Sequence, residues 1–348
     1  MTPATATGFW QRARRHGSFV AGGVLTALLA AAALLSVVWQ PYPPADIDIP
    51  NKLAPPSVAH WLGTDSLGRD LASQLLVGAQ NSILVGVVAV GIGLLLGVAL
   101  GCLAAAQQAG GRRWVDELVM RSCDFTFAFP ALLTAIMLTA IYGPGLLMSI
   151  VAIGIFNVPV FARIARNAAQ AVWVRDYVTA ARAAGKGPLA ITLDHVLPNI
   201  ASPLVVQASI SFATAILAEA ALSYLGLGTQ PPQPSWGRML NEAQLQMFQA
   251  PLLAVYPGVA IMLSVLGLNL LGDGLRDLVN PQARSARCPP RGMPRWRTGG
   301  AGSAAGGLVL CLLTSFTCLE TSKSRPGCLA ASTACCPARR PWPAARRS

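Results

Sequence analysis

Six apolar stretches of membrane-crossing length constrain this chain more than any other feature of its sequence. An apolar helix needs roughly 20 residues to cross the hydrocarbon core of a bilayer. Each stretch comes near that length without a Lys or an Arg, and Glu219 is the only formal charge within them: Phe19–Trp39, Ser82–Ala106, Phe125–Tyr142, Leu146–Ala162, Ser202–Leu225 and Leu252–Leu271. The sequence therefore predicts an all-α integral membrane protein with six transmembrane helices.

The composition supports this prediction and argues against nucleic-acid binding. Hydrophobic residues make up 53% of the 348 residues and charged residues 11%, whereas a typical soluble domain has about 25% charged residues. The net charge of +12 is concentrated in residues 284–348, which hold 11 Lys or Arg and a single acid, Glu320. The first 283 residues contain 15 basic and 13 acidic side chains, a net charge of +2. We therefore predict no nucleic-acid partner.

The first apolar stretch follows three arginines, an arrangement that a secretory signal peptide also shows. The stretch is long for a signal peptide, and no small-residue cleavage site follows Trp39. We expect a retained membrane anchor, with a signal peptide as the alternative.

The distribution of Lys and Arg between the loops predicts the orientation in the membrane. If the N-terminus is cytoplasmic, the inside segments carry 12 basic residues and the outside segments carry three. Cytoplasmic loops are enriched in Lys and Arg, so this arrangement is favoured. Residues 40–80 and 226–250 are then extracytoplasmic, and the loop 163–200 is cytoplasmic.

The charged loop 163–200 has a regular helical pattern. Asp176 suits the first turn of an alanine-rich helix, and Gly185 suits its end. Pro188 suits the first turn of a second helix, which Pro198 should end. We predict a helix–turn–helix finger with exposed small residues near its tip and polar contacts from Arg182, Lys186 and His195. An ordinary connecting loop is the alternative, but two helices need far fewer residues to link them.

We find no catalytic, nucleotide-binding or metal-binding pattern. Gly185-Lys186 is not a phosphate-binding loop, because Ala180 stands at the position of the leading glycine and Gly187 replaces the Ser or Thr. The eight cysteines form no Cys-x-x-Cys pair and lie near no His at metal-ligand spacing. We predict no catalytic residue, no metal site and no cofactor bound by this chain.

Glycines and prolines within the apolar stretches have a structural interpretation. Gly93, Gly97 and Gly101 recur every fourth residue and so share one helix face, which lets another backbone approach closely. We expect these glycines to pack helices, with a role in lining the solute pathway as the alternative. Pro130 and Pro159 should kink their spans, because each removes a backbone donor.

Glu219 is the one residue with a formal charge within the predicted spans. A carboxylate in hydrocarbon is costly, so it should face protein or water and have a partner. Glu219 lies seven residues before Gly226, close to the predicted outer end of its span. We favour a structural hydrogen bond near the outer interface, and a role in the solute pathway or in gating stays open.

The order of small residues in the charged loop follows a known pattern. The residues at fixed spacing are Ala180, Ala181, Gly185, Leu197 and Pro198. This spacing resembles the coupling loop of bacterial ABC-importer permeases, which docks on an ATPase subunit. The ending His195–Asn199 has the form found in peptide and nickel importers. Thr179 stands where that family usually has Glu, so the resemblance implies that one charged contact with the ATPase is missing.

Three further motifs occur in the order expected of one branch of that family. They are His60–Asp70 before the second span, Leu222–Gly228 with Gln230–Gly237 after the fifth, and Asn269–Asp277 in the sixth. They resemble motifs of the C-type permease subunit of dipeptide, oligopeptide and nickel ABC importers, with Trp61 in place of the usual Pro. The resemblance covers roughly residues 10–281.

The resemblance implies a set of partners and a location. The partners are a B-type sister permease in a heterodimer, two ATP-binding subunits and an extracytoplasmic solute-binding protein, in the lipid bilayer of the bacterial cytoplasmic (inner) membrane. ATP and Mg would be used by the partner subunits. The residues implied in ATPase coupling are Thr179, Ala180, Ala181, Arg182, Gly185, His195, Leu197, Pro198 and Asn199.

These observations divide the chain into four segments. They are a cytoplasmic N-terminus (1–18), a first span with an extracytoplasmic loop (19–81), a transporter domain with the coupling loop 163–200 (82–281), and an atypical tail (282–348). The tail is rich in Arg, Pro, Cys, Gly and Ala. Such a composition is typical of GC-rich coding read out of frame, so we favour a frameshifted end, with a genuine accessory tail as the alternative.

Two other classes of membrane protein fit the sequence less well. A secondary transporter would more often show paired intramembrane ionisable groups, and only Glu219 is present. A membrane-bound enzyme would need a convergent catalytic set, but His16 and His195 are predicted inside and His60 outside. We predict that the chain is a permease subunit of an ATP-driven importer, forming half of the translocation pathway for di- or oligopeptides. One alternative is that nickel or another small solute passes through the same machinery, and another is a secondary transporter.

Overall fold

The computed structural model describes residues 16–279. The chain divides into two units, residues 1–287 and 288–348, and every described residue lies in the first. The predicted tail 282–348 and residues 1–15 of the predicted cytoplasmic segment lie outside the described residues. Within residues 16–279 the regular secondary structure is helical, apart from one isolated β-bridge between Thr64 and Asp70.

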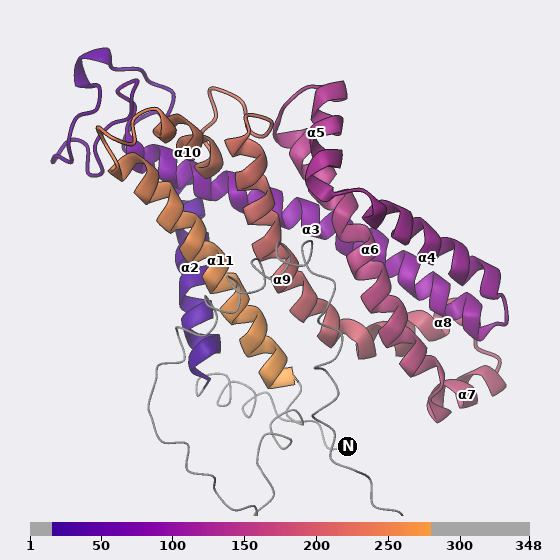
Figure 1. The fold of residues 1–348 in the computed structure, drawn as a ribbon. Coiled ribbons are helices and arrows are strands. Elements are labelled where there is room, and N and C mark those ends of the chain that lie inside the picture. The colour runs from indigo at the N-terminus through magenta and orange to yellow at the C-terminus, as the bar shows by residue number, and fades with distance from the viewer. Residues whose placement is uncertain (1–15, 280–348) are drawn as a thin grey trace, which may run out of the picture. The chain divides into compact units, whose positions relative to one another are not determined.

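The helices follow one another with mostly short connections (Figure 1). In chain order they are α2 (Gly17–Val38), η1 (Ile49–Asn51), α3 (Leu71–Ala109), α4 (Arg113–Ala128), α5 (Ala131–Tyr142), α6 (Leu146–Trp173), α7 (Asp176–Ala183), α8 (Pro188–Ile191), the π-helical turn η2 (Thr192–Val196), α9 (Leu197–Tyr224), α10 (Trp236–Gln244) and α11 (Leu252–Val279). In this part of the chain, five helical segments are long and apolar enough to cross a membrane, and the bent pair α4–α5 makes a sixth if it counts as one span.

The third predicted span, Phe125–Tyr142, is not one helix. α4 ends at Ala128, α5 begins at Ala131, and the two helices meet at 82°. Pro130 explains the break, because proline lacks a backbone N–H and disfavours the helical conformation in the residue before it. Phe129 is accordingly extended, with φ −97° and ψ 134°. The expected kink is therefore a complete interruption of the helix.

Two helices extend beyond the predicted apolar stretches. α3 begins at Leu71, well before the predicted start at Ser82, because Asp70 caps it by accepting a hydrogen bond from the Ser73 N–H at 2.8 Å. α6 continues to Trp173, so residues 163–173 of the predicted loop belong to the preceding helix. Apolar runs mark where a helix is buried in lipid, and a helix that extends beyond the hydrocarbon becomes polar without ending.

The most extensive helix contact is between α3 and α6. The three glycines on one face of α3 lie in this contact. A Cβ added to Gly93, Gly97 or Gly101 would overlap with atoms of α6, at Asn157, Val158 and Ala162 respectively. The small residues thus let the two backbones approach more closely than side chains would permit.

The connecting segments gather at two opposite ends of the helices (Figure 1). At one end, Arg69 pairs with Glu242 of α10, and the Gly145 N–H donates to the Leu227 carbonyl at 3.2 Å. The segments 40–80 and 226–250 therefore share one end, as the sequence predicts. Figure 1 shows α7 and α8 at the other end.

Candidate functional site

A short helical finger, defined here as residues 174–196, connects α6 to α9. The finger stands on an apolar base in which Val178, Ile191 and Val196 are each at most 1% exposed. These side chains belong to the same buried cluster as Trp173, at the end of α6. Because the base packs against α6 and leads directly into α9, the finger is fixed to both helices.

The turn at the tip of the finger depends on Gly185. This residue has φ +81°, a left-handed conformation that glycine adopts without the penalty of a Cβ. The Gly185 N–H donates to the Arg182 carbonyl at 2.9 Å, and the Lys186 N–H donates to the Ala181 carbonyl at 3.1 Å. Pro188 then occupies the first turn of α8. The end of α7 near Gly185 and the start of α8 at Pro188 thus lie where the sequence predicts them.

Pro198 does not end the second helix, contrary to the sequence prediction. α8 continues through the π-helical turn η2 into α9. In this turn the Leu197 N–H donates to the Thr192 carbonyl, five residues earlier. Pro198 therefore falls in the first turn of α9, a position that tolerates a residue without an N–H.

The outer face of the finger consists mostly of small, exposed residues. Thr179 and Ala180 are exposed, as is every residue from 182 to 190. A Cβ added at Gly185 or Gly187 would meet no atom within 4 Å. Of the other predicted coupling residues, Leu197, Pro198 and Asn199 are exposed, whereas Ala181 and His195 are half-buried. The predicted coupling residues from Thr179 to His195 thus lie on the finger, whereas Leu197, Pro198 and Asn199 form the start of α9 directly after it.

Lys186, Arg182 and His195 of the finger have side-chain partners within the chain. The Lys186 Nζ lies 3.0 Å from the Asp194 Oδ2. The guanidinium carbon of Arg182 lies 4.8 Å from the centroid of the Trp173 ring. The His195 and Tyr177 rings have centroids 6.0 Å apart. Sequence analysis did not identify the role of Trp173, because this residue belongs to α6 and meets Arg182 only through the fold.

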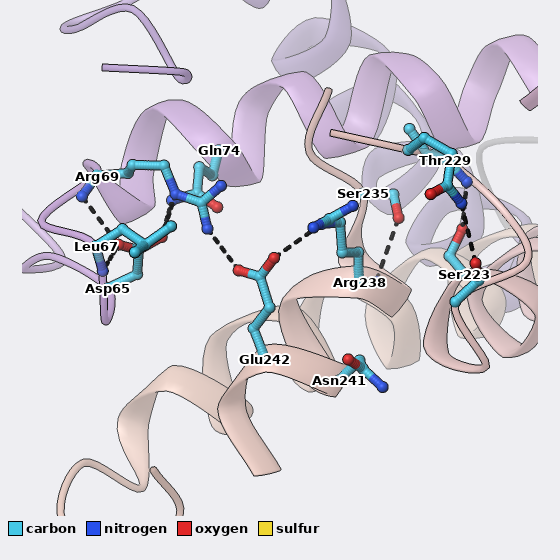
Figure 2. Close-up of polar contacts among 12 residues, drawn as sticks. Asp65, Leu67, Arg69, Gln74, Ser223, Thr229, Ser235, Arg238, Asn241 and Glu242 are labelled. Carbon is cyan, nitrogen blue, oxygen red and sulfur yellow. Dashed lines mark hydrogen bonds and ion pairs between the residues drawn. The ribbon is translucent and has the colours of Figure 1, made fainter. Parts of the chain in front are cut away.

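A second polar site lies at the opposite end of the helices, where Figure 2 shows a chain of ion pairs. The Arg69 Nε lies 2.6 Å from the Asp65 Oδ2, and its Nη2 lies 2.5 Å from the Glu242 Oε2. The Arg238 Nε contacts the other Glu242 oxygen at 2.8 Å. The buried Gln74 side chain also donates to Asp65, at 2.8 Å. This network joins the segment before α3 to α10.

The motif Pro234–Gly237 positions α10 for this network. Ser235 caps α10 by accepting a hydrogen bond from the Arg238 N–H at 3.3 Å. Trp236 is 2% exposed, and its Nε1 donates to the Leu75 carbonyl of α3 at 3.0 Å. Sequence analysis used this motif only as a resemblance and did not predict the pairing of Arg69 with Glu242, which are 173 residues apart.

Glu219 is fully buried and hydrogen-bonded. The Ser223 Oγ donates to the Glu219 Oε1 at 2.7 Å, and the Ser82 Oγ lies 3.5 Å from Oε2. The Ser223 Oγ also accepts the Thr229 N–H at 3.2 Å. These bonds join α3, α9 and the loop after α9, which supports the structural interpretation of Glu219.

The described residues contain no group of three or more His, Cys, Asp or Glu that could hold a metal ion. His60, one of the three histidines, has its Nδ1 3.1 Å from the Asp70 Oδ1 beside the start of α3. His195 lies at the base of the finger, at the opposite end of the helices from the His60–Asp70 pair.

Comparison with known proteins yields two family matches and a set of curated relatives. Residues 97–285 match the binding-protein-dependent transport system inner membrane component family, and residues 7–56 match the N-terminal TM domain of oligopeptide transport permease C. The glutathione transport system permease protein GsiD of Pectobacterium atrosepticum is 42% identical over 278 residues, 80% of this chain and 91% of the relative. GsiD of Escherichia coli O6:K15:H31 is 43% identical over 277 residues, 79% of this chain and 90% of the relative. A solved structure of the MetNI methionine ABC transporter aligns with a TM-score of 0.48 and 20% identity, over 59% of this chain and 96% of that chain.

Proposed function

The chain belongs to the binding-protein-dependent inner membrane components, as an ABC-importer permease of the oligopeptide type, and we propose that it forms one half of a solute pathway. It is a multi-pass protein of the bacterial inner membrane. The other half of the pathway is a B-type sister permease, and two ATP-binding subunits and an extracytoplasmic binding protein complete the importer. The ATP-binding subunits hold ATP and Mg, so this chain works without an ATPase site of its own.

The finger is the observation that carries this proposal. Its tip is exposed and built of small residues, which suits insertion into a groove of an ATP-binding subunit. Its base is buried against α6 and continuous with α9, so a displacement of the tip is passed to both helices. In this interaction Arg182 and Lys186 supply charge at the rim of the groove. Thr179 lacks the carboxylate that the family usually has at this position.

We further propose that the N-terminus and the finger are cytoplasmic. The basic residues support this orientation, since 12 fall in the inside segments and three in the outside segments. The shared end of segments 40–80 and 226–250, opposite α7 and α8, is consistent with it. The end that carries the Arg69–Glu242 network then faces the binding protein.

A small peptide is the proposed solute, with glutathione as the first candidate. The support is that the curated relatives are named as glutathione transport permeases and that glutathione is itself a peptide. Nickel has less support, because these relatives are not named for it.

Reconstitution of the importer tests this proposal. This chain is purified with its B-type permease, ATP-binding subunits and binding protein, and inserted into proteoliposomes. We expect uptake of radiolabelled glutathione that requires both ATP and the binding protein. Omission of ATP and omission of the binding protein are the controls. Uptake by the two permeases alone, driven by an ion gradient, would contradict ATP-driven import. ATP-dependent uptake of other solutes but not of glutathione would contradict only the choice of solute.

A further inference from the structure

A cavity of about 490 Å³ lies at the break between α4 and α5. Its volume falls in the range of roughly 300–1,000 Å³ that small-molecule sites occupy. Its lining includes Phe127, Phe129, Ile153, Phe156, Asn157 and Thr214. Among the described residues that line the cavity, none carries a formal charge.

The break itself makes this place unusual within a membrane protein. Non-helical backbone at membrane depth leaves polar groups without partners, and is tolerated only where it is buried in protein or lines a water-filled cavity. Phe129 and Pro130 form the break, and both line the cavity. Interrupted helices of this kind lie beside the solute in many transporters.

Two other walls of the cavity belong to the helices that the finger joins. Phe156 and Asn157 lie on α6, which ends at the finger, and Thr214 lies on α9, which begins there. A change in the angle between α6 and α9 would therefore change the width of the cavity. This continuity links the cavity to the finger and favours the transported solute as its occupant, rather than a fixed side chain of a partner.

We propose that the cavity is a transient station for an apolar side chain of a transported peptide, an inference that rests on the proposed function. Phe127, Phe129 and Phe156 supply an aromatic lining for such a side chain. An ionised side chain would lose its hydration there without a charged lining residue to pair with, which is costly. The nearby Arg163, which stacks on Phe127 at 4.5 Å, is already paired with Asp124. The station therefore selects apolar side chains over charged ones.

Asn157 adds a polar contact suited to a peptide. It is 8% exposed, and its Nδ2 donates to the Ile153 carbonyl at 2.9 Å, which fixes the side chain at the cavity wall. Because Nδ2 makes this bond, Oδ1 is the Asn157 atom that can accept a hydrogen bond from a peptide N–H of the occupant.

Photolabelling of the purified importer tests the station without the binding protein. The probe is a tripeptide whose central residue is benzoylphenylalanine, added to the detergent-solubilised complex. We expect the label on segments 127–135, 152–160 and 214–222, and protection by excess Gly-Phe-Gly but not by Gly-Glu-Gly. Ala218→Phe fills the cavity and should lower labelling by about tenfold. Leu217→Phe is the matched control, because Leu217 is the exposed neighbour on α9 and is not among the lining residues.

The outcomes separate this inference from the proposed function. Labelling outside these three segments, equal protection by both competitors, or labelling unchanged by Ala218→Phe would overturn the station. The absence of labelling in the wild-type complex would also overturn it. If Ala218→Phe then weakened co-purification of the sister permease, that permease would be the occupant of the cavity. In each of these cases ATP-dependent uptake by the wild type would leave the proposed function standing. Failure to assemble with ATP-binding subunits would contradict the proposed function itself.

Discussion

The guanidinium of Arg182 stacks on the ring of Trp173, with 4.8 Å between the guanidinium carbon and the ring centroid. Arg182 belongs to α7 and Trp173 to the last turn of α6. The contact therefore ties the exposed part of the finger to the helix that it is proposed to move. The apolar base beneath it, formed by Val178, Ile191 and Val196, makes the same connection through buried surface.

We expect the charge of Arg182 to contribute little to docking. Arg182→Met keeps much of the aliphatic stem and removes the cation, and an exposed ion pair with a partner contributes about 0–1 kcal/mol. The affinity for the purified ATP-binding subunit should therefore fall by no more than about fivefold, since 1.4 kcal/mol corresponds to about tenfold. Titration of that subunit against the detergent-solubilised permease pair measures this change. A complete loss of binding would show that Arg182 makes an essential contact with the partner.

The Arg69–Glu242 pair should stabilise the end of the helices that lies opposite the finger. Glu242→Gln removes the charge shared by Arg69 and Arg238 and should lower stability by about 1.5–3 kcal/mol, since hydrogen bonds to charged groups contribute that much. Thermal unfolding in detergent measures the effect. Glu117→Gln is the matched control, because the Glu117–Arg121 pair is largely exposed and should contribute about 0–1 kcal/mol. Equal decreases in unfolding temperature in the two variants would mean that the network stabilises the protein no more than an exposed ion pair does.

The close approach of α3 and α6 should depend on Gly97. Gly97→Val places two methyl groups where the α6 backbone lies, and overpacking typically costs about 1–3 kcal/mol or more. We expect less folded protein by fluorescence-detected size exclusion and a lower unfolding temperature. Gly91→Val is the control, since a Cβ added at Gly91 would meet no atom within 4 Å. A fully stable Gly97→Val variant would show that the helices do not need a glycine there.

The proposed orientation predicts which positions react from outside the cell. Single cysteines replacing Ser57 and Gln233, both exposed, should react with a membrane-impermeant maleimide in spheroplasts. A cysteine replacing Ala184 at the exposed tip of the finger should react only after the membrane is permeabilised. The native Cys102 and Cys123 are buried and should contribute little background, and the six native cysteines between residues 288 and 348 are replaced by serine in all the variants. Labelling of the Ala184 position in sealed spheroplasts would reverse the orientation.

Local sequence patterns predicted the helices better than the contacts between them. The first apolar stretch coincides closely with α2, and the sixth begins with α11 at Leu252, although the helix continues beyond it to Val279. Gly185 and Pro188 mark the turn of the finger. The run Phe125–Tyr142 concealed a break, because hydrophobicity alone does not show whether a proline bends a helix or interrupts it. Pro198 lies inside a continuous helical path because the π-helical turn shifts the hydrogen-bonding register, which the sequence does not show.

The contacts that join distant segments could not be predicted from the sequence. Arg69 and Glu242 meet only because Ser235 and Trp236 hold α10 against α3. Trp173 meets Arg182 only because α7 folds back on α6. Such pairs follow from the packing of whole helices, and neither partner carries a local signal of the other.

The measurement that tests the central claim most directly is ATP-driven uptake by a Gly185→Val importer. Valine at φ +81° is strained, and its branched side chain widens the tip that is proposed to enter the ATPase groove. Gly143→Val is the control, since Gly143 has φ +91° and equally open surroundings but lies between α5 and α6, outside the finger. We predict that Gly185→Val abolishes uptake and the stimulation of ATP hydrolysis by the loaded binding protein. Gly143→Val should retain both, and the solute affinity of the binding protein should not change. Full uptake and normal ATPase co-purification in Gly185→Val would contradict the account and leave the finger as a simple connector.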